Sequence, residues 1–315
     1  MRAPAFWTTD AFPAPLLAPL GVITRALTAR RVARPGYGSG ARVFCAGNAG
    51  VGGAGKTILA RHLLARLADR GETVFALTRG HGGRLAGPVR VDPARHDAAD
   101  VGDEALLLAA TAPTIVARDR AAGAAMAVAA GATAIVMDDG LQNPDPVKTA
   151  SFLVIDGGAG FGNGRLLPAG PLREPVDAAA GRCAAAVLIG ADRTGARAAL
   201  PPSLPVLTAR LVSDAGQLAG TRILGFAGIG RPEKFFESLR DAGVTLAGAL
   251  PFPDHHAYRP ADLARLDAEA GRLGARLATT AKDAVKLPPA FRARCAVIEA
   301  GLAFDDPAAL DRFLT

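Results

Sequence analysis

The sequence predicts an α/β protein: a mostly parallel sheet covered by helices on both faces, followed by a second, smaller α/β domain. Three observations support this prediction. Short apolar runs alternate with helix-like stretches along the chain, which is typical of parallel sheets. Of the 315 residues, 50% are hydrophobic and only 5% aromatic, so a large core is built mainly from Ala, Val, Leu and Ile. A glycine-rich turn follows the first strand-like run.

The individual elements follow from the same alternation. The expected strands are Arg42–Ala46, Thr73–Leu77, Thr114–Ala117, Ala132–Met137, Phe152–Ile155, Ala185–Ile189, Arg222–Phe226 and Arg276–Thr279. The expected helices are Lys56–Asp69, Glu104–Ala110, Ala121–Ala130, Pro232–Asp241 and Pro260–Leu273. A strand-like run breaks down near Ser213, and a second αβ series begins at Arg222. We therefore expect an N-terminal segment over residues 1–34, a core domain over 35–212 and a smaller domain over 213–315.

The charge and the cysteines narrow the class of protein. The 36 Lys and Arg residues exceed the 29 Asp and Glu residues by seven. A basic surface suits nucleic acid, an anionic membrane or phosphorylated substrates, and charge alone does not choose among them. The three cysteines stand far apart, so neither a disulfide framework nor a metal-ligand spacing is indicated, which fits a reducing cytosol.

The N-terminal segment is apolar and then basic. Residues Phe12–Ile23, FPAPLLAPLGVI, precede Arg25, Arg30, Arg31 and Arg34. This order is the reverse of a signal peptide, and twelve residues with three prolines are too short to cross a bilayer as a helix. Two interpretations stay open at this point: an amphipathic anchor at a membrane surface, or a segment packed on its own domain.

The glycine-rich turn predicts a phosphate-binding loop. It fits G-x-x-x-x-G-K-[ST] and lies between an apolar strand and a helix, the context in which this motif binds a nucleoside triphosphate. Consecutive backbone N–H groups and the helix N-terminus attract the anion. We expect Lys56 to reach the β- and γ-phosphates and the Thr57 hydroxyl to bind Mg²⁺. The ATP-binding residues are therefore Gly50, Val51, Gly52, Gly53, Ala54, Gly55, Lys56 and Thr57.

Two carboxylates indicate the other half of a metal site. Asp138 and Asp139 end the buried-looking strand of the segment Ala134–Gly140. Carboxylates at that end of a strand, beside the phosphate loop, are well placed to hold the Mg²⁺ shell. We expect at least one of the pair to have this role.

A phosphate loop does not determine what happens to the γ-phosphate. Three classes compete: a kinase with a small acceptor, a hydrolytic switch and a non-enzymatic nucleotide-sensing module. A switch is expected to carry a base-specificity motif such as Asn-Lys-x-Asp, which this chain lacks. A kinase needs a second polar constellation for its acceptor. Polar, glycine-rich candidates for it are Thr78–Gly83, Val101–Glu104, Asn163–Glu174 and Phe252–His256.

Taken together, these motifs resemble the tetraacyldisaccharide 4'-kinase family, the lipid A 4'-kinases of Gram-negative bacteria. The resemblance covers residues 4 to about 287, and the fourteen-residue block Gly162–Pro175, GNGRLLPAGPLREP, is especially specific. The other matching blocks are Pro4–Trp7, Gly47–Asn48 with the phosphate loop, Arg79–Gly83, Asp100–Glu104, Asp138–Gln142, Phe226–Pro232, Phe252–His256 and Lys282–Leu287.

The resemblance implies that the chain is a phosphotransferase with an alcohol group as the acceptor. ATP would donate its γ-phosphoryl group, with Mg²⁺, to the 4'-hydroxyl of tetraacyldisaccharide 1-phosphate and form lipid IVA. It also implies a P-loop core and peripheral attachment to the cytoplasmic face of the inner membrane, with residues 1–34 as the interfacial segment. Neither nucleic acid nor an obligate protein partner is expected. The alternatives are a P-loop kinase or ligase with a soluble acceptor, or a membrane-associated nucleotide-dependent switch.

The resemblance also implies roles for single residues. Asp103 is the candidate base, His255 its partner from the second domain, and Lys56 the third catalytic residue. Thr57, Asp138 and Asp139 would serve the metal. The candidate substrate or phosphate contacts are Arg79, Glu104, Gln142 and Arg173.

Three positions depart from the family pattern. Asn143 stands where a His is usual after Asp-Asp-Gly-x-Gln, and Asn cannot take up a proton as His can. Ala281 replaces the Glu of a Thr-Glu-Lys-Asp block, and Ile58 replaces a Pro after the loop threonine. The resemblance therefore implies no role for positions 143 and 281.

Overall fold

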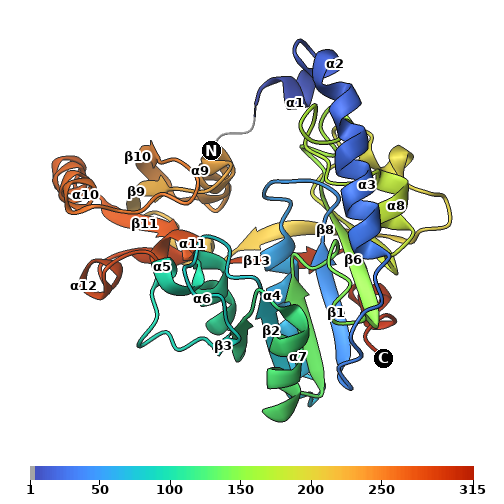
Figure 1. Ribbon diagram of the computed structural model, residues 1–315. Helices are drawn as coiled ribbons and strands as arrows, with labels where there is room; N and C mark the ends of the chain where they lie inside the picture. The colour runs from blue at the N-terminus through green and yellow to red at the C-terminus, as the bar shows by residue number, and fades with distance from the viewer. Residues whose placement is uncertain (1–3) are drawn as a thin grey trace.

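The structure is a computed structural model that describes residues 4–315. Within these residues the strands form two sheets that lie side by side (Figure 1). The larger sheet has the order β13-β8-β7-β6-β1-β5-β2-β4-β3, parallel throughout except at its two edges, where β13 and β3 run antiparallel. Its strands are β1 (Arg42–Gly47), β2 (Val74–Thr78), β3 (Val89–Arg90), β4 (Thr114–Val116), β5 (Ala134–Asp138), β6 (Ala150–Asp156), β7 (Ala185–Ile189), β8 (Val206–Ser213) and β13 (Ala300–Phe304). The predicted α/β fold is confirmed.

Helices bury both faces of the larger sheet. Alternate residues of β1 point to opposite sides: Phe44 joins a cluster with α4 and α13, and Cys45 joins a cluster with α7 and α8. Because both faces are covered, the central strands are apolar at most positions on both sides, as expected for a parallel sheet. The covering helices are α4 (Lys56–Ala68), α7 (Arg120–Ala129), α8 (Val176–Ala180) and α13 (Pro307–Asp311), and a 3-10 turn, η2 (Ala196–Ala199), adds to the second face.

The smaller sheet has the order β10-β9-β11-β12, with parallel pairing throughout. Phe236 of α9 packs on one face, and Leu266 of α10 with Phe291 of α12 packs on the other. The strands are β9 (Arg222–Ala227), β10 (Thr245–Pro251), β11 (Arg276–Thr280) and β12 (Ala296–Ile298). The helices are α9 (Pro232–Asp241), α10 (Pro260–Leu273), α11 (Ala281–Ala284) and α12 (Pro289–Arg292), with the 3-10 turn η3 (Ala215–Leu218) at the start.

The end of the chain differs from the predicted domain division. The smaller domain was expected to run over 213–315, but β13 returns to the larger sheet and pairs with β8. Phe304, Leu310 and Leu314 are buried in the same cluster as Leu63 of α4. The apolar side chains of this segment complete the core under α4, and short-range patterns cannot reveal such a long-range pairing. Residues 300–315 therefore belong with the larger sheet.

The N-terminal segment lies along the outside of the larger domain (Figure 1). It consists of α1 (Phe6–Thr9), α2 (Ala14–Leu17), η1 (Ala18–Leu20) and α3 (Gly21–Val32). Thr24 and Thr28 of α3 donate hydrogen bonds to the carbonyls of Leu167 and Arg173, at 2.7 and 2.9 Å. Among the described helices, none combines the length and apolarity needed to cross a bilayer.

Two short helices bring the domains together. α6 (Asp103–Ala109) follows α5 (Ala98–Val101) on the larger domain, and it contacts α11 of the smaller one (Figure 1). Figure 1 shows α5, α6 and α11 at the junction between the two sheets. This junction is where residues far apart in the sequence meet.

Candidate active site

The glycine-rich loop joins β1 to the first turn of α4. Gly52 and Gly55 have φ angles of 118° and 94°, which a residue with a side chain rarely adopts. At Gly55 a Cβ would also lie 2.7 Å from Ile189 Cδ1. These two glycines let the backbone turn sharply before Lys56 begins the helix. The loop therefore directs its N–H groups and the helix N-terminus to the carboxyl edge of the sheet.

Thr57 and Asp138 meet beside this loop. The Thr57 hydroxyl donates a 2.8 Å hydrogen bond to Asp138 Oδ2, while Asp138 Oδ1 is buried and has no partner among the described residues. Burial raises the pKa of Asp138 to about 6, and the nearby Asp139 charge adds to the rise, although Lys56 opposes it. A hydroxyl and a buried carboxylate with a free oxygen are ligands that suit Mg²⁺. The residues present fit the expected metal.

Asp139 is held differently from its neighbour. It has a φ of 56°, and its two oxygens accept hydrogen bonds of 3.0 and 3.1 Å from Arg173. Burial alone would raise the pKa of Asp139, but Lys56 and Arg173 outweigh it and hold the pKa below its ordinary value. The Lys56 ammonium lies 4.0 Å from Asp139 and 3.2 Å from the Gly52 carbonyl. The two adjacent aspartates thus have opposite electrostatic environments.

The Gly162–Pro175 segment, together with Gln142, holds the phosphate loop through hydrogen bonds. Arg173 donates its backbone N–H to Ala49 at 2.8 Å, and Val51 donates to Pro171 at 2.9 Å. Gln142 donates to the Asn48 carbonyl and to Glu174, both at 2.8 Å. Arg182, which sequence analysis missed, pairs with the buried Glu174 at 2.7 Å. Arg173 and Gln142 therefore lie beside the phosphate loop, and their contacts with substrate or phosphate stay predictions.

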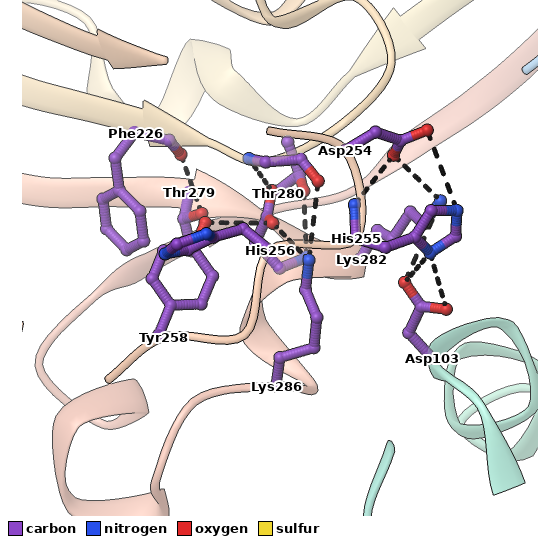
Figure 2. Close-up of polar contacts among 12 residues, drawn as sticks. Asp103, Phe226, Asp254, His255, His256, Tyr258, Thr279, Thr280, Lys282 and Lys286 are labelled. Carbon is purple, nitrogen blue, oxygen red and sulfur yellow. Dashed lines mark hydrogen bonds and ion pairs between the residues drawn. The ribbon is translucent and has the colours of Figure 1, made fainter. Parts of the chain in front are cut away.

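Asp103 and His255 come from different domains and are in contact (Figure 2). Asp103 is the first residue of α6 and is 5% exposed, and His255 lies on the loop after β10 with a φ of 58°. His255 Nδ1 is 2.9 and 3.2 Å from the two carboxylate oxygens. Burial alone would raise the pKa of Asp103, but the hydrogen bond to His255 and the charge of Lys282 hold it below the usual range. The same hydrogen bond raises the pKa of His255.

Glu104 and Lys282 complete this interdomain cluster. Lys282 Nζ lies 3.1 Å from Glu104 and 3.9 Å from Asp103. Burial raises the pKa of Glu104 to about 7, and the neighbouring Asp103 adds to the rise. The side chains of Asp103, Glu104 and His255 are close enough to surround a cation. However, Lys282 already compensates the acidic charge, so this group is better suited to proton chemistry than to a second metal.

Two arginines follow the neighbouring strands β2 and β4. Arg79 follows β2 and is exposed, and Arg120 opens α7 just after β4. Arg120 is 4% exposed, donates to the Ala117 carbonyl, and its Nε has no partner among the described residues. Burial lowers the pKa of Arg120 to about 10, and the positive charge of Arg79 adds to this. Arg120 was missed because an Asp-Arg pair before a helix usually indicates only a helix cap.

The three departures from the family pattern have structural explanations. Asn143 Oδ1 accepts the N–H of Asp145 at 3.0 Å, so its amide stabilises a turn. Ala281 is buried as the first residue of α11, where Thr280 caps the helix. Ile58 packs against the core beneath α4.

Comparison with known proteins gives consistent results. A family model described as LpxK, tetraacyldisaccharide-1-P 4'-kinase, matches residues 13–315. The chain is 57% identical to the tetraacyldisaccharide 4'-kinase of Gluconacetobacter diazotrophicus, over 100% of this chain and 97% of that protein. It is 54% identical to the enzyme of the same name from Methylobacterium radiotolerans, over 99% and 97%. Its fold matches the "apo" form LpxK from Aquifex aeolicus in complex with ATP, with a TM-score of 0.75, 21% identity and coverage of 96% and 98%.

The contrast between Asp138 and Asp139 predicts opposite effects of Asn substitutions on stability. The folded-state pKa of Asp138 lies near 6, above its ordinary 3.8, so its ionisation opposes folding; this penalty begins above about pH 4 and is complete above about pH 6. We expect Asp138→Asn to raise the free energy of unfolding at pH 8 by ~1–3 kcal/mol, and the gain to vanish near pH 4. The measurement is urea unfolding without nucleotide or metal.

Asp139→Asn is the matched control. Because the pKa of Asp139 is lowered in the fold, its ionised form stabilises the protein, and this stability is lost as the pH falls through the folded-state pKa. We expect this variant to be less stable than the wild type at pH 8. Destabilisation of similar size by both substitutions would contradict the assignment of a buried-charge penalty to Asp138.

Proposed function

This chain belongs to the tetraacyldisaccharide-1-P 4'-kinase family, and on that premise we propose that it transfers the γ-phosphoryl group of ATP to the 4'-hydroxyl of a tetraacylated disaccharide 1-phosphate, in lipid A biosynthesis. One observation in the structure supports a kinase independently of the family comparison. The phosphate loop offers a site for the donor and the Asp103–His255 pair one for the acceptor, and Lys282 beside that pair is close enough to Asp138 at the loop to lower its pKa. A kinase needs both, whereas a nucleotide switch needs only the first.

Mg²⁺ would be held by Thr57 and Asp138, with Asp139 beside them. When bound, the ion supplies positive charge that neutralises the phosphate oxygens during transfer. Lys56 adds a fixed charge to the same phosphates, and the loop N–H groups hold them in place. Arg173 keeps Asp139 oriented and is itself close enough to the loop to contact a phosphate. Together these residues bind and orient the donor and exclude water from it.

Asp103 is the proposed base for the acceptor hydroxyl. A sugar hydroxyl is a poor nucleophile, so a carboxylate within hydrogen-bond reach orients it and accepts its proton as the oxygen bonds to the γ-phosphorus and ADP departs. The lowered pKa keeps Asp103 ionised at neutral pH. His255, 2.9 Å away, holds the carboxylate in place and stabilises its charge. Glu104, Gln142, Arg79 and Arg173 remain the proposed contacts to substrate or phosphate.

The outer face of the N-terminal segment is proposed to bind the membrane that holds the lipid. While Thr24 and Thr28 face the protein, Phe12, Ile23 and Leu27 are 81, 58 and 60% exposed. Such an apolar face with arginines beyond it suits an anionic bilayer surface, since attachment needs both burial and charge. The exposed arginines that follow are Arg25, Arg30, Arg31 and Arg34. Because ATP is the donor, this surface is the cytoplasmic face of the inner membrane.

The direct test of the function is incubation of the purified protein with ATP, Mg²⁺ and tetraacyldisaccharide 1-phosphate, followed by mass spectrometry of the lipid. We expect a mass gain of one phosphate group. Lys56→Ala should lower kcat by about 10²–10³-fold, because it removes a charge that acts in the transition state. Arg66→Ala, at the opposite end of α4 where it pairs with Asp311, is the control and should be near wild type. ATP hydrolysis without lipid phosphorylation would favour a switch instead.

The proposed pair of Asp103 and His255 predicts non-additive kinetics. Asp103→Ala and His255→Ala should each lower kcat by about 10²-fold or more, with little change in the KM for ATP. The double variant should be little worse than the poorer single variant, because residues that act as a unit are not additive. Fully additive losses, with altered ATP binding, would indicate two separate structural roles.

The proposed membrane face predicts a loss of vesicle binding. Ile23→Asp combined with Leu27→Asp should reduce co-sedimentation with anionic vesicles by about tenfold or more, since two apolar side chains lose their burial. Met126→Asp is the control, because Met126 is 37% exposed on α7, outside the N-terminal segment. Deleting residues 1–33 is a less specific test, since it also removes the Thr24 and Thr28 hydrogen bonds. Unchanged co-sedimentation of the double variant would place the attachment elsewhere.

A further inference from the structure

The smaller domain contains a fully buried carboxylate to which the proposed mechanism assigns no role. Asp283 of α11 is 0% exposed. It accepts four hydrogen bonds or ion pairs from three separate segments, and in Figure 2 the labelled donors Tyr258, Thr280 and Lys286 converge on one point. The donors are the Gly228 N–H at 3.0 Å, the Thr280 hydroxyl at 2.7 Å, the Tyr258 hydroxyl at 3.0 Å and the Lys286 ammonium at 2.8 Å. Such a satisfied buried network fixes the segments that it joins.

One of these segments leads directly to His255. Gly228 donates its N–H to Asp283 and accepts the His255 N–H on its carbonyl at 3.2 Å. The close approach leaves little room for a side chain: a Cβ on Gly228 would lie 3.0 Å from the Pro253 carbonyl and 3.1 Å from Asp283. His255 itself has a φ of 58°, an unfavourable backbone conformation that its surroundings must maintain. A single residue, Gly228, therefore connects Asp283 to the backbone of His255.

The same carboxylate also orients Lys282. Thr280 caps α11 by accepting the Asp283 N–H at 3.1 Å, and it donates its hydroxyl to the Asp283 carboxylate. With the single turn of α11 fixed in this way, the preceding residue, Lys282, points to the larger domain. There its ammonium group reaches Glu104 at 3.1 Å and Asp254 at 3.6 Å. Figure 2 shows Lys282 and His255 side by side above Asp103.

We propose that Asp283 is a positioning residue for phosphoryl transfer: through Gly228 and α11 it holds His255 and Lys282 against the Asp103–Glu104 pair of the other domain. This inference rests on the proposed function, since it concerns the same acceptor site. Asp283 touches neither substrate nor nucleotide. Its effect on the reaction passes through the two side chains that it orients.

The test places Asp283→Asn in the wild type and in the His255→Ala variant. Asn keeps the size of the side chain but loses the charge that holds Lys286. In the wild type we expect kcat to fall by about 10–100-fold, because a displacement of about 1 Å at a reacting group has this effect. The KM for ATP should change less than about twofold, and in His255→Ala the added loss should be below about threefold. An equal loss in both backgrounds would overturn the proposal.

Two further variants separate positioning from stability. Tyr258→Phe removes one hydroxyl and keeps the ring, so it should fold. It should lower kcat less than Asp283→Asn does, and again more in the wild type than in His255→Ala. If Asp283→Asn fails to fold, kcat of Tyr258→Phe in these two backgrounds tests the proposal instead. Leu239→Ala creates a cavity on the opposite face of the smaller sheet, in a cluster that contains none of the side chains of this network. If Leu239→Ala lowers kcat as much at a matched loss of Tm, Asp283 has only a structural role.

A spectroscopic measurement tests the inference without any assay of activity. Asp103, Glu104, Asp254, Lys282 and the His81 ring face the His255 ring, and the bond to Asp103 raises the pKa of His255 above its usual 6.5. In Asp283→Asn we expect the His255 pKa, followed by NMR, to fall toward 6.5 as that bond is lost. An unchanged pKa would overturn the inference. If the wild type phosphorylates no lipid, the proposed function fails, while this measurement still decides whether Asp283 positions His255.

Discussion

Charge buried at the carboxyl edge of a parallel sheet is the constraint on which the site depends. β1 lies between β5 and β6, so the phosphate loop, the two aspartates after β5 and the loops from β2 and β4 all open on the same edge. Charges taken from water are costly unless they are paired and hydrogen-bonded. Around this edge Asp139 is paired with Arg173 and Glu174 with Arg182, while one oxygen of Asp138 has no partner within residues 4–315. The incomplete pairing is located where the donor nucleotide and its metal are proposed to bind.

The same rule of compensation governs the contact between the domains. Acidic Asp103 and Glu104 face basic His255 and Lys282 across the junction. At a second contact between the domains, the Asp156 carboxylate at the end of β6 forms ion pairs with Arg231 and Lys234 of the smaller domain, at 3.0 and 2.8 Å. Each domain thus supplies the charges that the other needs. The same ion pairs therefore determine both the relative placement of the domains and the electrostatics of the site.

The sequence was most informative where the physical determinants are local. The phosphate loop needs glycines, lysine and threonine in one short stretch. The helices α9 and α10 begin and end at the predicted residues, because Pro opens each of them and a glycine in the left-handed conformation, Gly243 or Gly274, follows each end. Asp103 and His255 were named only through the family resemblance, since their contact joins residues 152 positions apart. Arg120, Asp283 and the pairing of β13 were not found, because each depends on burial against distant segments. Propensity and spacing carry no information about such contacts.

The return of the chain to the larger sheet has a mechanical consequence. The chain leaves that sheet at Ser213 and re-enters it at Ala300, and these two residues are direct partners in the antiparallel β8–β13 pair. The backbone of Glu299 also donates to Asp214 at 3.0 Å, which ties the two crossings together. The smaller domain is therefore an insertion held by two adjacent tethers. Such a double tether allows bending about the line that joins the two strands and resists twisting about either one. The double tether thus restricts how the smaller domain can turn relative to the larger sheet, which helps to keep His255 opposite Asp103.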